Sequence, residues 1–142
     1  SEMCIRDSMR EKENRMDYKE LMEKAKEAAQ TAYAPYSKFK VGACLATPDG
    51  KTFCGCNFEN SSFGLTICAE RNAVGTAIAN GERKISAIAI YSPNLENCLP
   101  CGACRQVLHE FRSETGIDVI TEAGGELKIY KLDELLPGGF DL

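Results

Sequence analysis

The chain has 142 residues, 44% of them hydrophobic and 27% charged, which is typical of one globular domain. No run approaches the roughly 20 apolar residues that a membrane-spanning helix needs, and no secretory signal pattern stands out, so we expect a cytoplasmic protein with no membrane partner. The net charge of −4 comes without a basic cluster, which argues against a nucleic-acid partner.

The first fifteen residues are charged and lack periodicity, so we expect residues 1–15 to be a non-native or disordered extension, with Met16 as a plausible start. Residues 16–142 then form a single domain. From Asp17 onward, apolar residues recur at helical spacing until Pro35, which is expected to end this first helix. Its alternating charges predict a solvated face.

Two strand-like runs follow, FKVGACLAT and KTFCGCNF, and the Pro48-Asp49-Gly50 turn between them indicates a hairpin. A second helix is expected over about 68–80, stopped by Gly81. The apolar run ISAIAIY predicts a strand that is buried on both faces of a sheet. A third helix is expected over about 101–113, and the runs IDVI and ELKIY predict two last strands before a short tail.

This order of elements predicts an α/β fold, a three-layer α/β/α domain around a mixed five-stranded sheet. The connection between the last two strands decides their relative direction. Only about four residues, 122–125, link them, whereas a parallel crossover needs a dozen or more. The last two strands are therefore predicted to be antiparallel.

Three of the eight cysteines have the spacing of metal ligands. Cys101 and Cys104 form a C-x2-C pair, which lets both sulfurs bind one ion, and Cys68 could supply a third thiolate. All three lie at expected helix N-termini, where the helix dipole stabilises thiolates. Three protein ligands, with a fourth position left for water, are typical of a catalytic zinc site, and thiolate ligation favours zinc among the metals.

Glu70 and Arg71 follow Cys68 on the same expected first turn. A carboxylate there could take a proton from zinc-bound water and deliver it elsewhere. Three thiolates and Zn²⁺ sum to −1, and a guanidinium that donates to the sulfurs would offset this charge. Zinc-dependent nucleobase deaminases use a metal ligand, one residue, a glutamate and then P-C-x-x-C. Here these segments read C-A-E and P-C-G-A-C.

The sequence closely resembles the small homotetrameric cytidine deaminases over about residues 17–140. The motifs that carry this resemblance are, in chain order, AYAPYSKFKVGA, GCNFENSS, TICAERNAV, PCGACRQVL and ELLPGGF. The resemblance implies a zinc-dependent hydrolase of pyrimidine salvage, which converts cytidine and 2′-deoxycytidine to the uridine nucleosides and ammonia. It also implies a homotetramer with one zinc ion per subunit and active sites completed by neighbouring subunits.

The resemblance also implies roles for the motif residues. Cys68, Cys101 and Cys104 would hold zinc. Glu70 would deprotonate the attacking water, protonate N3 of the ring, and then protonate the leaving amine after attack at C4. Arg71 would donate hydrogen bonds to the thiolates without binding the metal itself.

The resemblance implies the substrate contacts as well. Phe39 would pack on the pyrimidine ring. Asn57 and Glu59 would hydrogen-bond the base and the ribose 3′-hydroxyl, and backbone groups of Ala69 and Cys101 would hold the polar edge of the ring.

Two further aromatic residues belong to the expected site. The resemblance implies that Phe140 reaches into a neighbouring subunit's site, and an aromatic side chain after two glycines by itself indicates an arm that docks elsewhere. Phe63 stands where many relatives carry a tyrosine soon after the EN pair, so a hydroxyl contact to the ribose 5′ end would be absent or replaced. The chain also stops two residues after Phe140, without the longer tail of some relatives.

The other cysteines and the histidine allow further interpretations. Cys54 and Cys56 could close a four-cysteine structural zinc site with the C-x2-C pair, but Glu70 would then have no purpose. His109, the only histidine, is rotated by about 140° from Cys104 on a helix, so a surface or packing role is expected. Two more cysteines, at positions 44 and 98, are interpreted as small buried hydrophobic residues.

Three alternatives concern function. A deaminase of another aminopyrimidine nucleoside, such as blasticidin S, would share the fold and the zinc site, although the NFEN and PYSKFKVGA motifs favour free cytidine. A polynucleotide-editing deaminase is the second alternative. In the relatives of that kind, the last two strands are parallel and a helix connects them, and the link at 122–125 is too short to contain such a helix. A structural-zinc or inactive scaffold would have no use for Glu70.

Overall fold

The computed structural model describes residues 18–142, so the extension expected at residues 1–15 and the start at Met16 lie outside the described residues. A helix over residues 18–30 comes first. The elements after it are β1 (Gly42–Ala46), β2 (Thr52–Cys56), the 3-10 helix η1 (Phe63–Leu65), α2 (Ala69–Ala79), β3 (Ala87–Tyr91), α3 (Gly102–Glu110), β4 (Asp118–Ala123), β5 (Glu126–Lys131) and α4 (Leu132–Leu135).

The five strands form one mixed sheet in the order β2-β1-β3-β4-β5. β3 lies in the middle and pairs parallel with β4, whereas the other three pairings are antiparallel. The turn between β4 and β5 consists of Gly124 and Gly125, both with positive φ (59° and 78°), the backbone conformation of a tight hairpin turn. The predicted mixed sheet with antiparallel last strands is therefore confirmed.

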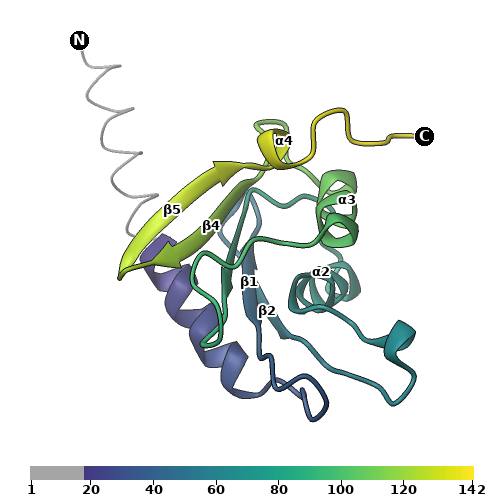
Figure 1. The fold of residues 1–142 in the computed structure, drawn as a ribbon. Helices are drawn as coiled ribbons and strands as arrows, with labels where there is room; N and C mark the ends of the chain where they lie inside the picture. Colours follow the sequence, from purple (N-terminus) through teal and green to yellow (C-terminus); the bar gives the residue numbers. More distant parts are fainter. Residues whose placement is uncertain (1–17) are drawn as a thin grey trace.

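Helices cover both faces of the sheet, as Figure 1 shows, so the predicted three layers are confirmed. The larger core lies between the sheet and helices α2 and α3, and its side chains include Leu45, Val74, Ile88, Ile90 and Leu108. The smaller core lies between the sheet and the first helix, and its side chains include Leu21, Met22, Ala25, Cys44 and Ile120. Each fully buried Leu or Ile stabilises the fold by about 1.5–3 kcal/mol.

Two glycines let helices approach the β1–β2 hairpin closely on opposite faces. A Cβ atom on Gly42 would lie 2.0 Å from the carbonyl oxygen of Ala25 in the first helix. A Cβ atom on Gly55 would lie 2.4 Å from the backbone nitrogen of Ala73 in α2. Real Cβ atoms do not approach backbone this closely, so these contacts fix α2, and the residues at its N-terminus, against the sheet.

Some expected boundaries are wrong by a few residues. The first helix ends at residue 30 rather than at Pro35, because the Tyr33 N–H donates to the Asn57 carbonyl (3.0 Å) and the backbone is extended there. α3 stops at residue 110, because the Ser113 N–H donates to the Ile85 carbonyl (2.9 Å) instead of continuing the helix. The tail also contains the short helix α4, which the sequence analysis did not anticipate.

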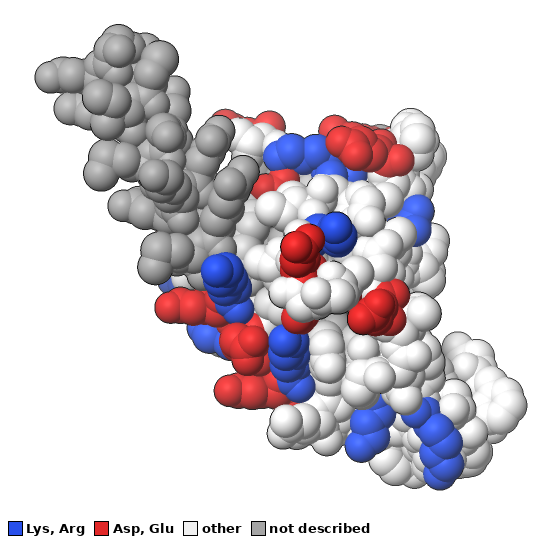
Figure 2. All heavy atoms as spheres, turned by 60° about the vertical axis from the view of Figure 1, so that its left-hand side comes forward, with Lys and Arg blue, Asp and Glu red and all other residues white. Residues whose placement is uncertain are grey.

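Figure 2 shows lysine and arginine side chains interspersed with aspartate and glutamate, densest along the first helix. Lys26, for example, lies 2.8 Å from the carboxylate of Glu122 and 3.5 Å from that of Glu23. This mixed pattern agrees with the solvated face predicted for that helix. Within residues 18–142, no helix has the length and apolarity needed to cross a membrane.

Candidate metal and catalytic centre

Three cysteine sulfurs converge at one point of the structure. The sulfurs of Cys68, Cys101 and Cys104 all lie within 4.8 Å of one another, and those of Cys68 and Cys101 are 4.0 Å apart. Tetrahedral ligands at a Zn–S distance of about 2.3 Å are roughly 3.8 Å apart, so the cluster fits a zinc ion. Between residues 18 and 142, this is the one group of three or more potential ligands with such spacing.

Helices α2 and α3 position these sulfurs. Cys68 is the N-cap residue of α2, Cys101 is the N-cap residue of α3, and Cys104 lies in the first turn of α3. The two helices lie on the same face of the sheet, so their N-termini meet (Figure 1). The unpaired N–H groups and the positive dipole end of each helix favour the thiolate form. The expected placement of these cysteines at helix N-termini is confirmed.

The charge on the cluster is partly balanced by Arg71. Its Nη2 atom donates to the Cys68 sulfur and to the carbonyl oxygen of Thr66, each at 3.5 Å. A hydrogen bond with Cys104, followed by the interaction with Arg71, lowers the pKa of Cys68 to about 5. Cys68 is therefore a thiolate at neutral pH, which is the form that binds a metal.

Glu70 is the buried carboxyl group of the site. It lies in the first turn of α2 with 5% of its surface exposed. Its pKa is raised to about 7, mainly by burial and also by the negative charge of Cys68. Hydrogen bonds and the charge of Arg71 act in the opposite direction. A carboxyl group with a pKa near neutral pH can both accept and release a proton, as a proton shuttle must.

Asn57 lies directly after β2 and is also buried, at 8% exposure. Its Oδ1 accepts a hydrogen bond from the Val41 N–H (2.9 Å), and its Nδ2 donates to the carbonyl oxygen of Phe39 (2.8 Å). These bonds hold the backbone on both sides of residue 40. From the sequence, Asn57 is predicted to contact the substrate or, alternatively, to be a turn residue at the end of the strand, and neither prediction includes this positioning of the Phe39 loop.

Glu59 fixes the preceding part of the same loop. Its Oε1 accepts hydrogen bonds from the N–H groups of Tyr36 (3.0 Å) and Ser37 (3.2 Å), and its Oε2 accepts one from the Ser37 hydroxyl. The bond from the hydroxyl lowers the pKa of Glu59, so this side chain is a carboxylate at neutral pH. Only the polar character of the NFEN segment hinted at these long-range contacts.

The other expected substrate-binding residues lie in two kinds of environment. Phe39 is half-buried and packs against the larger core, to which the fully buried Ala69 also belongs. Phe63 is 72% exposed, and its ring centroid lies 5.7 Å from that of Tyr36. Phe140 is 67% exposed. The structure thus places Phe63 and Phe140 on the surface of the subunit.

Among residues 18–142, the other cysteines and the histidine do not belong to the cluster. His109 is buried on α3 and contacts Asp141 (3.1 Å), so a packing role is confirmed and a surface position is wrong. Cys98 is a small buried residue, as interpreted, and burial raises its pKa to about 11. Cys54 lies against the buried Cys44 of β1 instead of completing a four-cysteine site.

Comparisons with known proteins identify the family. The zinc-binding region of cytidine and deoxycytidylate deaminases matches residues 15–118. The cytidine deaminase of Sporosarcina psychrophila is 42% identical over 125 residues, covering 88% of this chain and 92% of the relative. A crystal structure of cytidine deaminase from Burkholderia pseudomallei has 46% identity and a TM-score of 0.78 over 84% of this chain and 96% of that one. A crystal structure of cytidine deaminase from Mycobacterium tuberculosis has 37% identity and a TM-score of 0.78, over 89% of this chain and 98% of that one. A cluster of three cysteines beside a buried glutamate, in a chain with these similarities, shows that the protein belongs to the cytidine deaminase family.

Proposed function

We propose that this protein hydrolyses the exocyclic amino group of cytidine and 2′-deoxycytidine, which gives the uridine nucleosides and ammonia. The observation that carries the proposal is the burial of Glu70 beside the sulfurs of Cys68, Cys101 and Cys104. The relatives that match over nearly the whole chain are cytidine deaminases, which supports the substrate class.

The three cysteines would hold one zinc ion per subunit, and zinc in such a site activates water for attack on carbon. Glu70 supplies the proton transfers. Its carboxylate accepts the proton that the attacking water loses and delivers it to N3 of the ring. It then takes the remaining proton from the hydroxyl now on C4 and passes it to the amino group, which leaves as ammonia as the C4 carbonyl forms. A pKa near 7 suits both directions of transfer.

The substrate contacts follow from the loop that Asn57 and Glu59 hold. Phe39 on that loop packs on the pyrimidine ring, and the Glu59 carboxylate accepts a hydrogen bond from the ribose 3′-hydroxyl. Asn57 has a second amide hydrogen available for the nucleoside, because its side-chain hydrogen bonds to Val41 and Phe39 use the oxygen and one amide hydrogen. Backbone groups of Ala69 and Cys101 hold the polar edge of the ring.

The active form would be a homotetramer in which Phe140 completes a neighbouring subunit's site. The support is a set of exposed large apolar side chains, which a monomer would leave in water: Tyr33, Tyr36, Phe58, Phe63, Leu65 and Phe140. Phe63, which has no hydroxyl group to contact the ribose, takes part in the contact between subunits. Residues 16–142 would form the whole domain, and pyrimidine salvage in the cytoplasm would be its setting.

Turnover of cytidine followed by ultraviolet absorbance tests the proposal. The purified protein is compared with a sample stripped of metal by a thiol-compatible chelator and with the same sample after zinc is restored. We expect turnover that is lost on stripping and returns with zinc. A zinc-loaded tetramer that leaves cytidine and 2′-deoxycytidine unchanged would overturn the proposal, and blasticidin S would be the next substrate to assay.

A further inference from the structure

Two cysteines outside the metal cluster face each other across the β1–β2 hairpin. Cys44 of β1 and Cys54 of β2 are direct partners in the antiparallel register. Their sulfurs lie 2.7 Å apart. Cys44 belongs to the smaller core, between the sheet and the first helix, whereas the metal cluster lies at α2 and α3 on the other face. The pair is thus separate from the catalytic centre.

The backbone places this pair at a position where a disulfide fits. The Thr47 N–H donates to the Lys51 carbonyl, which makes residues 47 and 51 a hydrogen-bonded pair. Because hydrogen-bonded and non-hydrogen-bonded pairs alternate along an antiparallel ladder, Cys44 and Cys54 form a non-hydrogen-bonded pair. The Cα atoms of such a pair lie about 4.5 Å apart, within the range of about 4.4–6.8 Å that disulfides span.

One of the two sulfurs is accessible and the other is not. Cys54 is exposed on the edge strand β2, whereas Cys44 has no exposed surface. A hydrogen bond with Cys44 is the main cause that lowers the pKa of Cys54 to about 7, and the charge of Lys24 contributes while that of Glu27 opposes it. The same hydrogen bond, followed by burial, raises the pKa of Cys44. Cys54 is therefore the nucleophile that an oxidant in solution meets first.

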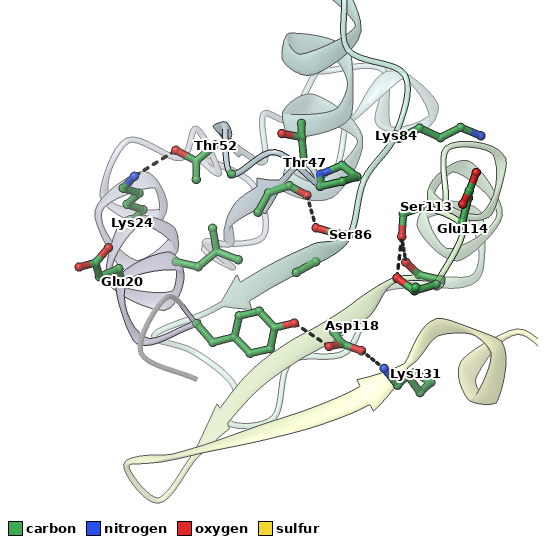
Figure 3. A pocket seen from close by; sticks show the side chains of 18 residues that line it. Glu20, Lys24, Thr47, Thr52, Lys84, Ser86, Ser113, Glu114, Asp118 and Lys131 are labelled. Carbon is green, nitrogen blue, oxygen red and sulfur yellow. Dashed lines mark hydrogen bonds and ion pairs between the residues drawn. The ribbon is translucent and has the colours of Figure 1, made fainter. Parts of the chain in front are cut away.

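The first helix places the positive charge beside this strand. Figure 3 shows Lys24 reaching from the helix to β2, where its Nζ donates to the Thr52 hydroxyl (3.0 Å). Thr52 lies two residues before Cys54 on the same face of the strand. A fixed ammonium group next to a thiolate favours attack on a disulfide, because it stabilises the attacking form.

We propose that Cys44 and Cys54 form a reversible disulfide across the hairpin when the protein meets a small-molecule disulfide such as glutathione disulfide. The Cys54 thiolate attacks one sulfur of glutathione disulfide, which forms a mixed disulfide and releases one glutathione thiolate. The Cys44 thiol then loses its proton and attacks the Cys54 sulfur, which releases the second glutathione. Two cysteine thiols are oxidised and one glutathione disulfide is reduced to two glutathione molecules.

Peptide mapping of the zinc-loaded protein tests this directly. The protein is incubated with glutathione disulfide, free thiols are blocked with iodoacetamide, and the chain is digested with trypsin without reductant. Cleavage after Lys40, Lys51 and Arg71 separates Cys44, in peptide 41–51, from Cys54, in peptide 52–71. We expect a linked pair of these peptides, lighter by two hydrogen atoms than their sum, which disappears after treatment with dithiothreitol.

Cys56 provides a matched control. It lies on the same face of β2 as Cys54, but its partner across the hairpin is Gly42, which has no thiol. The linked peptide should be lost in Cys54→Ser and retained in Cys56→Ser, and fragment ions of the wild-type peptide should locate the bond at Cys54. Glutathione attached to Cys54 with Cys44 still free, or a link through Cys56, would overturn the proposal. Peptide masses do not depend on turnover, so this result and that of the cytidine assay are independent.

Discussion

The Nη2 atom of Arg71 lies 3.5 Å from the sulfur of Cys68, one helical turn along α2. The interaction with Cys68 is also the main cause that raises the pKa of Arg71. A permanent positive charge at this place offsets the excess negative charge of three thiolates around a divalent ion. We therefore propose that the guanidinium supports the metal site through the Cys68 sulfur.

Replacing Arg71 with glutamine should weaken zinc binding by roughly 10- to 100-fold, as is typical for groups that support metal ligands. Competition with a chromophoric chelator measures this change. The matched control is Arg83→Gln, because the Arg83 guanidinium donates to two carbonyl oxygens away from the cluster, that of Ile78 in the last turn of α2 and that of Glu82 after the helix. Equal zinc affinity in the two variants would contradict the role of Arg71.

Replacing Glu70 with glutamine keeps the size of the side chain but removes its ability to carry a proton. Because general acid–base groups are worth roughly 10²- to 10⁴-fold, kcat for cytidine should fall by that factor. Zinc content and oligomeric state, measured on the same sample, should stay those of the wild type. Wild-type turnover in a zinc-loaded Glu70→Gln protein would show that another group transfers the proton.

The raised pKa of Glu70 also predicts how the stability of the metal-free protein depends on pH. The unfolded chain ionises this carboxyl group at its ordinary pKa of 4.5, whereas the folded chain does so only at about 7. Below pH 4.5 the carboxyl group is neutral in both states, so its burial takes nothing from the free energy of unfolding. The cost grows as pH rises and is complete above the higher value, where it is on the order of 3 kcal/mol.

Glu70→Gln should accordingly stabilise the metal-free protein more at about pH 8 than at about pH 5. Urea unfolding of both proteins at each pH gives the four free energies required. Taking the difference between variant and wild type at each pH removes the contribution of the cysteine thiols, which both proteins share. A stability difference that is the same at both pH values would mean that Glu70 has an ordinary pKa.

The sequence allowed prediction of those parts of the site that depend on local spacing. Cys101 and Cys104 lie three residues apart at the start of one helix, and Glu70 lies two residues after Cys68 at the start of another, so helix geometry alone places these side chains. The antiparallel direction of β5 followed in the same way from the length of one connection. Such features need no knowledge of distant contacts.

Features that depend on contacts between distant segments were missed. The end of α3 is set by a bond from Ser113 to Ile85, and no local signal marks it. The pairing of Cys44 with Cys54 could have been found, because both lie five residues from Asp49 at the centre of the predicted turn. The interpretation of Cys44 as a small buried residue is correct but did not consider its partner across the hairpin.

The backbone contacts of Asn57 make it a positioning residue for the Phe39 loop. Asn57→Leu should leave the Val41 N–H buried without a partner, which costs about 1–3 kcal/mol of stability. Urea unfolding measures this loss, and KM for cytidine should rise because Phe39 is no longer held. Asn57→Asp keeps the acceptor for Val41 and should lose less stability. An Asn57→Leu protein with wild-type stability would contradict the importance of these bonds.

The C-terminal tail is held against α3 by polar contacts. Gln106 donates to the Phe140 carbonyl (2.8 Å) and accepts from the Phe140 N–H (3.2 Å). The Asp141 carboxylate pairs with Arg112 and with His109, each at 3.1 Å. The backbone of Phe140 is thus fixed on both sides while its ring remains exposed. This arrangement supports the proposal that the Phe140 ring projects into a neighbouring subunit's site.

Gly139 packs directly on the His109 ring, and a Cβ atom there would lie 2.7 Å from Nδ1. Because His109 is buried and cannot move aside freely, Gly139→Ala should displace the tail and, with it, Phe140. Because Phe140 is proposed to complete a substrate site, its displacement should cost up to roughly 100-fold in kcat/KM. Asp141→Ala should act in the same direction by removing the contacts with Arg112 and His109, whereas Asp133→Ala, an exposed change of equal charge on α4, should leave kcat/KM unchanged. Wild-type kcat/KM in Gly139→Ala, measured by the ultraviolet assay, would show that the position of the tail has no part in the reaction.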